Sequence, residues 1–200
     1  MLRRLFDLVV SAGVLVVCSP LLLLALIAIP LESRGSPIYR QRRVGLDGAQ
    51  FEVIKLRTMV SGAENLGAGL AVAENDARIT RLGALLRRAS LDELPNLVNV
   101  LRGEMAIIGP RPTVDAQVQQ YTPRQRQRLS VRPGITGWAQ VNGRAGLTWN
   151  ERIELDLWYI AHRTWKLDRQ ILRRSFRTVF AGDALYRTDG PAWTGAAEDE

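Results

Sequence analysis

The chain has 200 residues and a formal net charge of +7, and 46% of its residues are hydrophobic. This length accommodates one compact domain with an appendage but not two full catalytic domains, and the composition excludes a disordered chain and a multi-span transporter. A single cysteine and a single histidine exclude an intramolecular disulfide, a structural zinc site and a histidine-based metal centre. The positive charge favours an anionic partner, whether nucleic acid, phosphorylated substrate or acidic lipid.

Residues 8–31 form an uncharged segment in which 19 of 24 residues are hydrophobic. Such a segment can cross a hydrocarbon core about 30 Å thick, but arginines flank both ends, and the positive-inside rule favours the cytoplasmic side for each flank. Ser19 and Pro20 interrupt the middle, because proline removes a backbone hydrogen bond and the serine hydroxyl can satisfy the freed carbonyl. A re-entrant helix that bends at Ser19-Pro20, a kinked membrane span and a cleaved signal peptide stay open from these residues.

The rest of the chain predicts a mostly helical fold with short strands. In chain order the pattern first predicts a β-hairpin of two runs, from Pro37-Ile38 to Val44 and over 50–56, and a loop over 61–77. It then predicts helices over 79–88 and 94–101, a short buried strand or turn over 105–108, and helices over 114–121 and from Pro123. An extended segment over 135–141 and helices over 148–162 and 167–181 follow. Apolar and basic stripes on the last helix are typical of a helix at a membrane interface, or of a core helix with a solvated edge. The predicted fold class is α+β.

Two adjacent carboxylates, Asp92 and Glu93, stand at the predicted start of the 94–101 helix. Ser90 and Glu93 have the spacing of a capping box, although a cap at Ser90 would place Pro95, which has no backbone donor, inside the helix. Alternatively, a carboxylate beside a bound phosphate can attack phosphorus and its neighbour can hold a magnesium ion. Helix capping and phosphoryl chemistry both stay open from the spacing.

Cationic residues surround this dyad in the sequence. Arg111 lies between two prolines, and a stiff turn of this kind suits bidentate phosphate recognition by a guanidinium group. The candidates are Lys55, Arg57, Arg87, Arg88, Arg111, Arg132 and Arg144. Asp156 is either a ligand or the partner of Arg152 in an i, i+4 ion pair. The chain has no P-loop, no Rossmann glycine fingerprint, no GxSxG elbow and no HExxH motif.

Several collinear motifs resemble the bacterial sugar transferases called monotopic polyprenol-phosphate phosphoglycosyl transferases. They are Ser19-Pro20, Gly35-Ser36-Pro37-Ile38, Lys55-Leu56-Arg57-Thr58-Met59, Ser90-Leu91-Asp92-Glu93-Leu94-Pro95, Gly109-Pro110-Arg111-Pro112 and the segment from Arg132 to Arg144. The resemblance extends over roughly residues 1–185. One departure is Leu56, where the family commonly has phenylalanine, a change of volume that a core tolerates.

The resemblance implies an enzyme that transfers a sugar 1-phosphate from a nucleotide sugar, usually a UDP-sugar, to undecaprenyl phosphate and releases UMP. This would be the first membrane step of glycoconjugate or exopolysaccharide assembly. By position, Asp92 is the nucleophile that forms a covalent aspartyl phosphosugar intermediate, and Glu93 is the ligand of Mg2+. The positions that match substrate-contacting or phosphate-binding residues of the family are Lys55, Arg87, Arg111, Arg144 and Asp156.

The resemblance also implies an N-terminal re-entrant membrane helix hairpin, kinked at Ser19 and Pro20, with amphipathic interfacial helices. The implied domains are a membrane segment over 1–33, a cytoplasmic catalytic domain over 34–187 and a flexible tail over 188–200. The protein would then rest on the cytoplasmic face of the bacterial inner membrane. Its partners would be a nucleotide sugar, undecaprenyl phosphate and inner-membrane lipids, without nucleic acid; a homo-oligomer is compatible with the sequence. The alternatives are a membrane-tethered anion-binding protein and a membrane phosphohydrolase.

Overall fold

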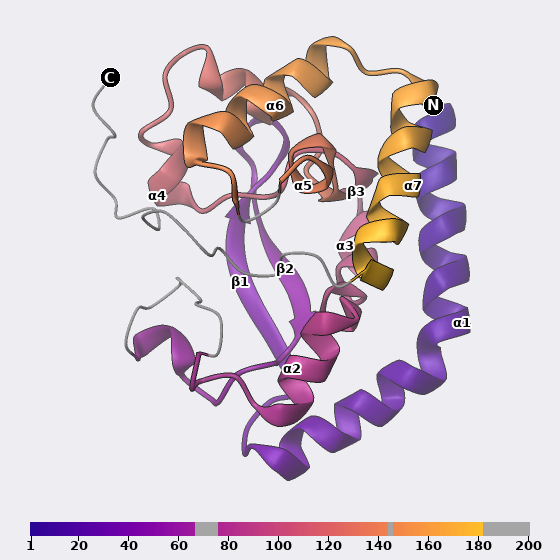
Figure 1. Ribbon diagram of the computed structural model, residues 1–200, viewed down its shortest axis with the longest axis vertical. Coiled ribbons are helices and arrows are strands. Elements are labelled where there is room, and N and C mark those ends of the chain that lie inside the picture. Colours follow the sequence, from indigo (N-terminus) through magenta and orange to yellow (C-terminus); the bar gives the residue numbers. More distant parts are fainter. Residues whose placement is uncertain (67–75, 144–145, 182–200) are drawn as a thin grey trace. The chain divides into compact units, whose positions relative to one another are not determined.

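A computed structural model describes residues 1–66, 76–143 and 146–181, the last four of these without their side chains (Figure 1). Backbone contacts divide the chain into two compact units: Met1–Gln41 with Glu52–Ile107, here unit 1, and Arg42–Phe51 with Ile108–Glu200, here unit 2. The predicted division into a membrane segment, a catalytic domain and a tail, with boundaries after residues 33 and 187, stays a prediction. The predicted tail over 188–200 lies outside the described residues.

Unit 1 begins with α1 (Leu2–Glu32), a single helix that contains Pro20 and Pro30. Figure 1 shows that α1 bends part-way along its length, and an internal proline is the usual cause of a sharp kink. Pro20 has no N–H to donate to the carbonyl of Val16, four residues earlier, and the Ser19 hydroxyl donates to that carbonyl instead at 2.7 Å. The predicted role of Ser19 in satisfying a freed carbonyl is therefore confirmed.

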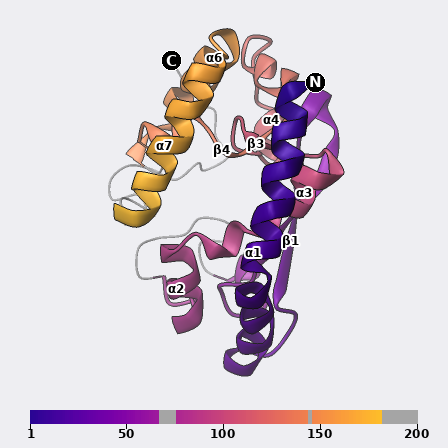
Figure 2. The ribbon, with the colours of Figure 1, turned by 90° about the vertical axis from the view of Figure 1, so that its right-hand side faces the viewer.

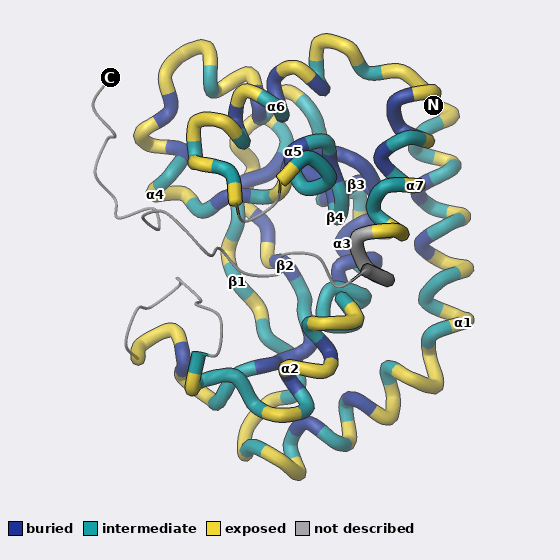
Figure 3. The backbone as a smooth tube through the Cα atoms, viewed as in Figure 1, coloured by how far each residue is buried: buried dark blue, intermediate teal, exposed yellow. Residues whose placement is uncertain are grey.

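Most residues of α1 are exposed or only partly buried (Figure 3), and many of its large apolar residues are exposed. Only 11% of its most apolar 18-residue window is buried, which is too little for the core helix of a soluble domain. By length and composition α1 could cross a membrane. An exposed apolar surface of this size indicates contact with another apolar phase, and it supports membrane association of the chain.

The N-terminal part of α1 packs against α3 (Asn96–Arg102) (Figure 2). Arg4 donates to the carbonyl of Val100 at 2.6 Å and to that of Leu101 at 2.9 Å, so it caps the C-terminal end of α3. The buried carboxylate of Asp7 accepts the N–H of Ile107 at 3.0 Å. These polar contacts attach the beginning of the apolar helix to the rest of unit 1.

The C-terminal end of α1 is attached to α2 (Arg81–Arg88). The carboxylate of Glu32 accepts the N–H of Arg81 at 2.9 Å and that of Leu82 at 3.1 Å. These are two of the donors that a helix N-terminus leaves without an intrahelical partner. One hydrophobic core cluster of unit 1 includes residues of both helices and consists of Ala25, Ile29, Leu56 and Leu86.

The hairpin of β1 (Ile38–Val44) and β2 (Gln50–Leu56) matches its predicted limits. Its turn contains the short 3-10 helix η1 (Leu46–Gly48). In unit 1 the buried Asn99 of α3 binds the second strand, because its side chain accepts the N–H of Ile54 at 3.1 Å and donates to the carbonyl of Glu52 at 2.7 Å. The other short elements of unit 1 are η2 (Ala63–Asn65), η3 (Leu91–Glu93) and most of β3 (Ala106–Ile108).

Unit 2 is mostly helical. Its remaining elements are α4 (Asp115–Val118), η4 (Gln125–Ser130), β4 (Gly134–Thr136), α5 (Trp138–Val141), α6 (Trp149–Ala161) and α7 (Trp165–Ala181). The strand β4 pairs with the end of β3. A hydrophobic core cluster of unit 2 consists of Val44, Val118, Tyr121, Ile153 and Leu157. The helix α6 begins with the capping box that Thr148 and Glu151 were predicted to form.

The mixed, mostly helical fold class is confirmed, and the main error in the predicted elements lies over 135–141. Only Gly134–Thr136 is a strand, and residues 138–141 form the helical turn α5. Gly137 separates the two, and a Cβ at this position would lie 2.1 Å from the carbonyl oxygen of Gly109. The close approach of the two backbones at Gly137 therefore marks the end of the strand.

Candidate active site

The dyad Asp92-Glu93 occupies a 3-10 turn between two helices of unit 1. The turn η3 follows Ser90, which has a left-handed backbone (φ 54°, ψ 22°) and makes no side-chain cap hydrogen bond. The next helix, α3, begins only at Asn96, after Pro95. The capping box that Ser90 and Glu93 could have formed is therefore absent, and Glu93 is not used as a cap, in accord with the conflict that Pro95 would have created.

Glu93 pairs instead with Lys55, at the end of β2. The Lys55 Nζ lies 2.6 Å from Glu93 Oε1, and both side chains are 21% exposed. A lysine at this distance offsets part of the negative charge of the two adjacent carboxylates. Arg87, near the C-terminal end of α2, donates through Nε to Thr58 Oγ1 at 2.8 Å, which orients its guanidinium group. Unit 1 thus brings Lys55 to the dyad and places Arg87 three residues before the dyad's strained turn.

The neighbouring cation, Arg57, has a structural role. It is buried, and it donates at 2.9 Å to the carbonyl of Arg34 and at 3.2 Å to that of Gly35, besides bonds to both oxygens of Ser33. The guanidinium group therefore holds the segment that follows α1. The motif that contains Lys55 and Arg57 combines a cation at the dyad with a cation that supports the chain.

Unit 2 contains Arg111 and Asp156, while Arg144 lies outside the described residues. Arg111 is exposed. Asp156 is only 1% exposed and pairs with Arg128, whose Nε lies 2.7 Å from Asp156 Oδ2. Arg152, the i, i+4 partner considered for Asp156, donates through Nε to the carbonyl of Leu147 at 3.1 Å, and its charge opposes the rise that burial causes in the pKa of the Asp156 carboxyl.

Burial dominates the electrostatics of this pair. It raises the pKa of the Asp156 carboxyl, and the adjacent Arg128 opposes that effect. Burial alone would lower the pKa of Arg128, but Asp156 and Tyr121 raise it above its usual value, so this guanidinium stays charged. Arg128 is a residue that the sequence did not single out, because nothing in the repeated Arg-Gln pattern around it predicts burial.

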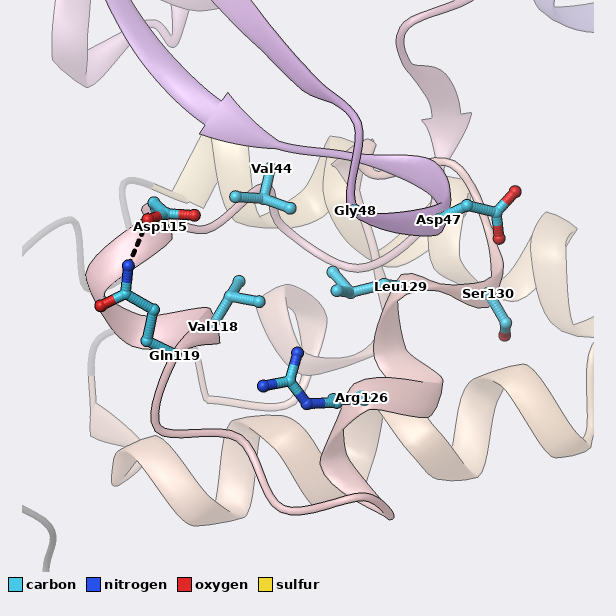
Figure 4. Close-up of a pocket in the computed structure, with 9 residues that line it drawn as sticks. All are labelled: Val44, Asp47, Gly48, Asp115, Val118, Gln119, Arg126, Leu129 and Ser130. Carbon is cyan, nitrogen blue, oxygen red and sulfur yellow. Dashed lines mark hydrogen bonds between the residues drawn. The ribbon is translucent and has the colours of Figure 1, made fainter.

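A separate cavity of about 480 Å³ lies within unit 2 (Figure 4). Its lining combines apolar and polar side chains, and Asp115 accepts a hydrogen bond from Gln119 at its edge (2.6 Å). The lining residues are Val44, Asp47, Gly48, Asp115, Val118, Gln119, Arg126, Leu129 and Ser130. None of the predicted site residues is among them, so this cavity is not assigned to the dyad.

The donor set at the dyad suits a magnesium ion only together with other ligands. Among residues 1–66, 76–143 and 146–181 no group of three or more His, Cys, Asp or Glu side chains could hold a metal. Mg2+ commonly binds one or two carboxylates and completes its shell with water and substrate phosphate oxygens. Asp92 and Glu93 supply hard oxygen donors of this kind, so the residues fit a metal shared with a phosphorylated substrate.

Sequence comparison identifies the class of protein. The model of the bacterial sugar transferase family matches residues 1–182. The chain is 43% identical over 195 residues to a UDP-glucose:undecaprenyl-phosphate glucose-1-phosphate transferase of Caulobacter vibrioides, covering 92% of this chain and 72% of that protein. It is 40% identical over 189 residues to the uncharacterized sugar transferase EpsL of Bacillus subtilis, covering 94% and 92%.

Longer relatives match over the same region. The chain is 42% identical over 192 residues to the UDP-glucose:undecaprenyl-phosphate glucose-1-phosphate transferase of Escherichia coli, but it spans only 40% of that protein. The matched region includes the hairpin, the dyad and the arginine-bearing loops. The chain therefore belongs to the bacterial sugar transferase family and is an enzyme of that class, which confirms the resemblance read from its motifs.

Proposed function

We propose that the protein transfers a sugar 1-phosphate from a UDP-sugar to undecaprenyl phosphate, releasing UMP and forming undecaprenyl-diphosphate-sugar. The names of relatives in Caulobacter and Salmonella, which specify glucose and galactose respectively, support this substrate class. The observation that carries the proposal is the dyad: an Asp-Glu pair in a strained turn, with a lysine held against the glutamate at 2.6 Å. Strained backbone is typical of functional sites.

The proposed chemistry has two displacements at one phosphorus. A carboxylate oxygen of Asp92 attacks the sugar-bearing phosphorus, the bond from that phosphorus to the oxygen bridging it to UMP breaks, and UMP leaves. A phosphate oxygen of undecaprenyl phosphate then attacks the same phosphorus, and the Asp92 carboxylate leaves. Lys55 and Arg87 offset the negative charge that gathers when dyad, diphosphate and lipid phosphate meet.

We propose that Glu93, together with Asp92, holds Mg2+ when the nucleotide sugar binds. The ion would supply charge neutralisation at the diphosphate. Lys55 already neutralises Glu93 in the described structure, so it keeps this carboxylate paired before the substrate arrives.

The proposed location is the cytoplasmic face of the bacterial inner membrane, with α1 as a re-entrant helix. The bend in α1, the Ser19 hydrogen bond to Val16 and the exposed apolar surface support this location. A helix that bends at Pro20 and returns would place the dyad near the depth at which undecaprenyl phosphate presents its headgroup.

The decisive experiment incubates the purified protein with radiolabelled UDP-glucose or UDP-galactose, Mg2+ and undecaprenyl phosphate. We expect a lipid-linked diphosphosugar, and without the lipid acceptor we expect a radiolabelled acid-stable, hydroxylamine-sensitive protein adduct typical of an acyl phosphate. Asp92→Asn should remove both signals, with a loss of at least about 1000-fold in rate. Asp115→Asn, on an exposed carboxylate of unit 2, is the matched control and should keep both.

Full activity of Asp92→Asn would show that another group is the nucleophile. Release of free sugar phosphate without lipid product would identify a phosphohydrolase, and the absence of any turnover with salt-sensitive anion binding would identify a binding protein. Chelation of the metal by EDTA should abolish turnover, and added Mg2+ should restore it.

A further inference from the structure

The loop that carries Arg111 has four consecutive carbonyls held by hydrogen bonds within unit 2. Pro110 accepts from Gly134 N–H at 2.8 Å, and Thr113 accepts from Val44 N–H at 2.9 Å. Between them, Pro112 accepts from Arg43 Nη1 at 3.3 Å and Arg111 accepts from Arg128 Nη2 at 2.8 Å. The prolines on either side of Arg111 further restrict its backbone. The exposed Arg111 side chain therefore extends from a backbone with little conformational freedom.

Arg128 is the only side chain among these partners that is itself deeply buried, at 5% exposed. Its guanidinium binds three different oxygens: Asp156 Oδ2 at 2.7 Å, Tyr121 Oη at 2.7 Å and the carbonyl of Arg111. Its face also lies over the Trp149 ring, 5.5 Å from the centroid. These contacts fix the orientation of the planar Arg128 guanidinium group, so its hydrogen bond to the Arg111 carbonyl has a defined direction.

Asp156, on α6, binds Arg128 although the burial of its own carboxylate is energetically costly. Its second oxygen, Oδ1, is buried and has no hydrogen-bond partner. A buried ion pair that is only partly hydrogen-bonded contributes little net stability, because desolvation offsets the attraction between the charges. At 1% exposed, Asp156 also lacks the accessibility needed to touch a substrate. Direct contact with a substrate therefore does not account for a carboxylate at this position, whereas its pairing with the buried charge of Arg128 does.

We infer that Asp156 is a positioning residue: through Arg128 it fixes the backbone carbonyl of Arg111 and so sets the direction in which the Arg111 guanidinium is presented to a phosphate group. This inference rests on the proposed function for the identity of the ligand. The family resemblance suggested substrate contact for Asp156, and the inference assigns it an indirect role instead. A phosphate-binding arginine gains most when its geometry is set before the ligand arrives, since a displacement of about 1 Å can reduce the rate about 100-fold.

The test is a double-mutant cycle on kcat/KM with Asp156→Asn and Arg111→Ala. Asp156→Asn alone should reduce kcat/KM about 10- to 100-fold, and it should cause no further reduction in the Arg111→Ala background, because both changes remove the same interaction. An additive loss would overturn the inference, since Asp156 would then act independently of Arg111. Arg128→Lys keeps the positive charge but lacks the planar guanidinium donors, so it should reduce kcat/KM as Asp156→Asn does.

A matched control exists on the same two elements. Arg124, at the start of η4, pairs with Glu154 on α6, two residues before Asp156, but this pair is exposed. Glu154→Gln should leave kcat/KM within about twofold of wild type, because exposed pairs contribute little. A merely structural role of Asp156 would instead lower the melting temperature while leaving kcat/KM unchanged below that temperature.

Hydrogen–deuterium exchange tests the loop without relying on turnover. In Asp156→Asn the amides of Val44 and Gly134, which bind the loop carbonyls, should exchange faster, and in Glu154→Gln they should not. Unchanged exchange at both amides in Asp156→Asn would overturn the inference whatever the activity. If the wild-type protein forms no lipid-linked product, the proposed reaction fails, and the exchange result alone decides whether Asp156 holds the loop.

Discussion

At the scale of single residues, the backbone of Ser90 is held in an unfavourable conformation two residues before Asp92. Left-handed geometry costs an L-residue about 1–2 kcal/mol, and at φ 54° Ser90 bears this cost while its side chain makes no cap hydrogen bond. The conformation turns the chain from α2 into η3, which presents the dyad. The backbone of Ser90, rather than its hydroxyl, therefore shapes the turn that precedes Asp92.

Glycine and valine at position 90 should have opposite effects. Ser90→Gly removes the Cβ penalty and should raise the free energy of unfolding by up to about 1 kcal/mol with activity retained. Ser90→Val places a β-branched residue in the left-handed region and should lower it by about 1–2 kcal/mol, together with turnover. Thermal unfolding in detergent and the transferase assay measure the two quantities. Equal stability of the two variants would exclude backbone strain at Ser90.

At the scale of secondary-structure elements, α6 and α7 are joined by a buried hydrogen bond. Tyr159 on α6 is fully buried, and its hydroxyl donates to Asp168 on α7 at 2.8 Å. Burial, and then the bond to Asp168, raises the pKa of Tyr159. The neutral phenol is therefore the form that the folded state favours.

Removal of this hydroxyl should destabilise the protein in a pH-dependent way. Tyr159→Phe should lower the free energy of unfolding by about 1–3 kcal/mol, because the buried Asp168 loses a donor. Since the folded-state pKa is raised, the contribution of Tyr159 is complete below the ordinary tyrosine pKa of about 10 and is lost as the pH rises above it.

The free energy of unfolding should therefore be measured for wild type and Tyr159→Phe at pH 8 and at pH 11. The difference between the two proteins should be smaller at pH 11 than at pH 8. Tyr39→Phe is the control, because the Tyr39 hydroxyl binds Glu64 at the exposed surface of unit 1. This change should shift stability by less than about 0.5 kcal/mol. A difference between wild type and Tyr159→Phe that does not change with pH would contradict the role of the phenol proton.

The elements also show which parts of the fold the sequence could predict. The hairpin was located correctly because turn residues and flanking β-branched residues are local signals. The start of α6 was predicted from another local signal, the capping-box spacing of Thr148 and Glu151. The extended segment over 135–141 was misjudged because its turn at Gly137 depends on the close backbone of Gly109, a contact that no local pattern encodes. Arg128 was overlooked for the same reason: its burial follows from tertiary packing.

The dyad could be proposed from sequence because adjacent carboxylates before Pro95 are difficult to explain as a helix cap, and the structure confirms that Ser90 makes no side-chain cap hydrogen bond. The partner of Glu93 was not predictable, since Lys55 lies 38 positions away in the chain. The sequence singled out Asp156 as a candidate, but it could not show that this carboxylate is buried against an arginine. That finding requires the burial and the bond directions that the structure provides.

At the scale of the whole molecule, the proposed re-entrant path of α1 predicts that the segments before and after this helix lie on the same side of the membrane. Single cysteines replacing Leu2 or Asp47, both exposed, can report this in a Cys18→Ser background that removes the native thiol. For a re-entrant helix, a membrane-impermeant maleimide should label neither site in intact cells and both after permeabilisation. A spanning helix would expose exactly one site, and a cleaved signal peptide would remove the cysteine at position 2 from the mature chain.

The cap that Glu32 provides to α2 has a further consequence. The last residue of the apolar helix supplies acceptors to the first amides of the helix that leads to Ser90 and the dyad. A chain shortened to begin after this residue would lose the cap, the Ala25 and Ile29 side chains of the unit 1 core, and the partner of α3. The apolar helix is therefore an integral part of unit 1: α1, α2 and the turn that carries Asp92 and Glu93 should fold, and unfold, together.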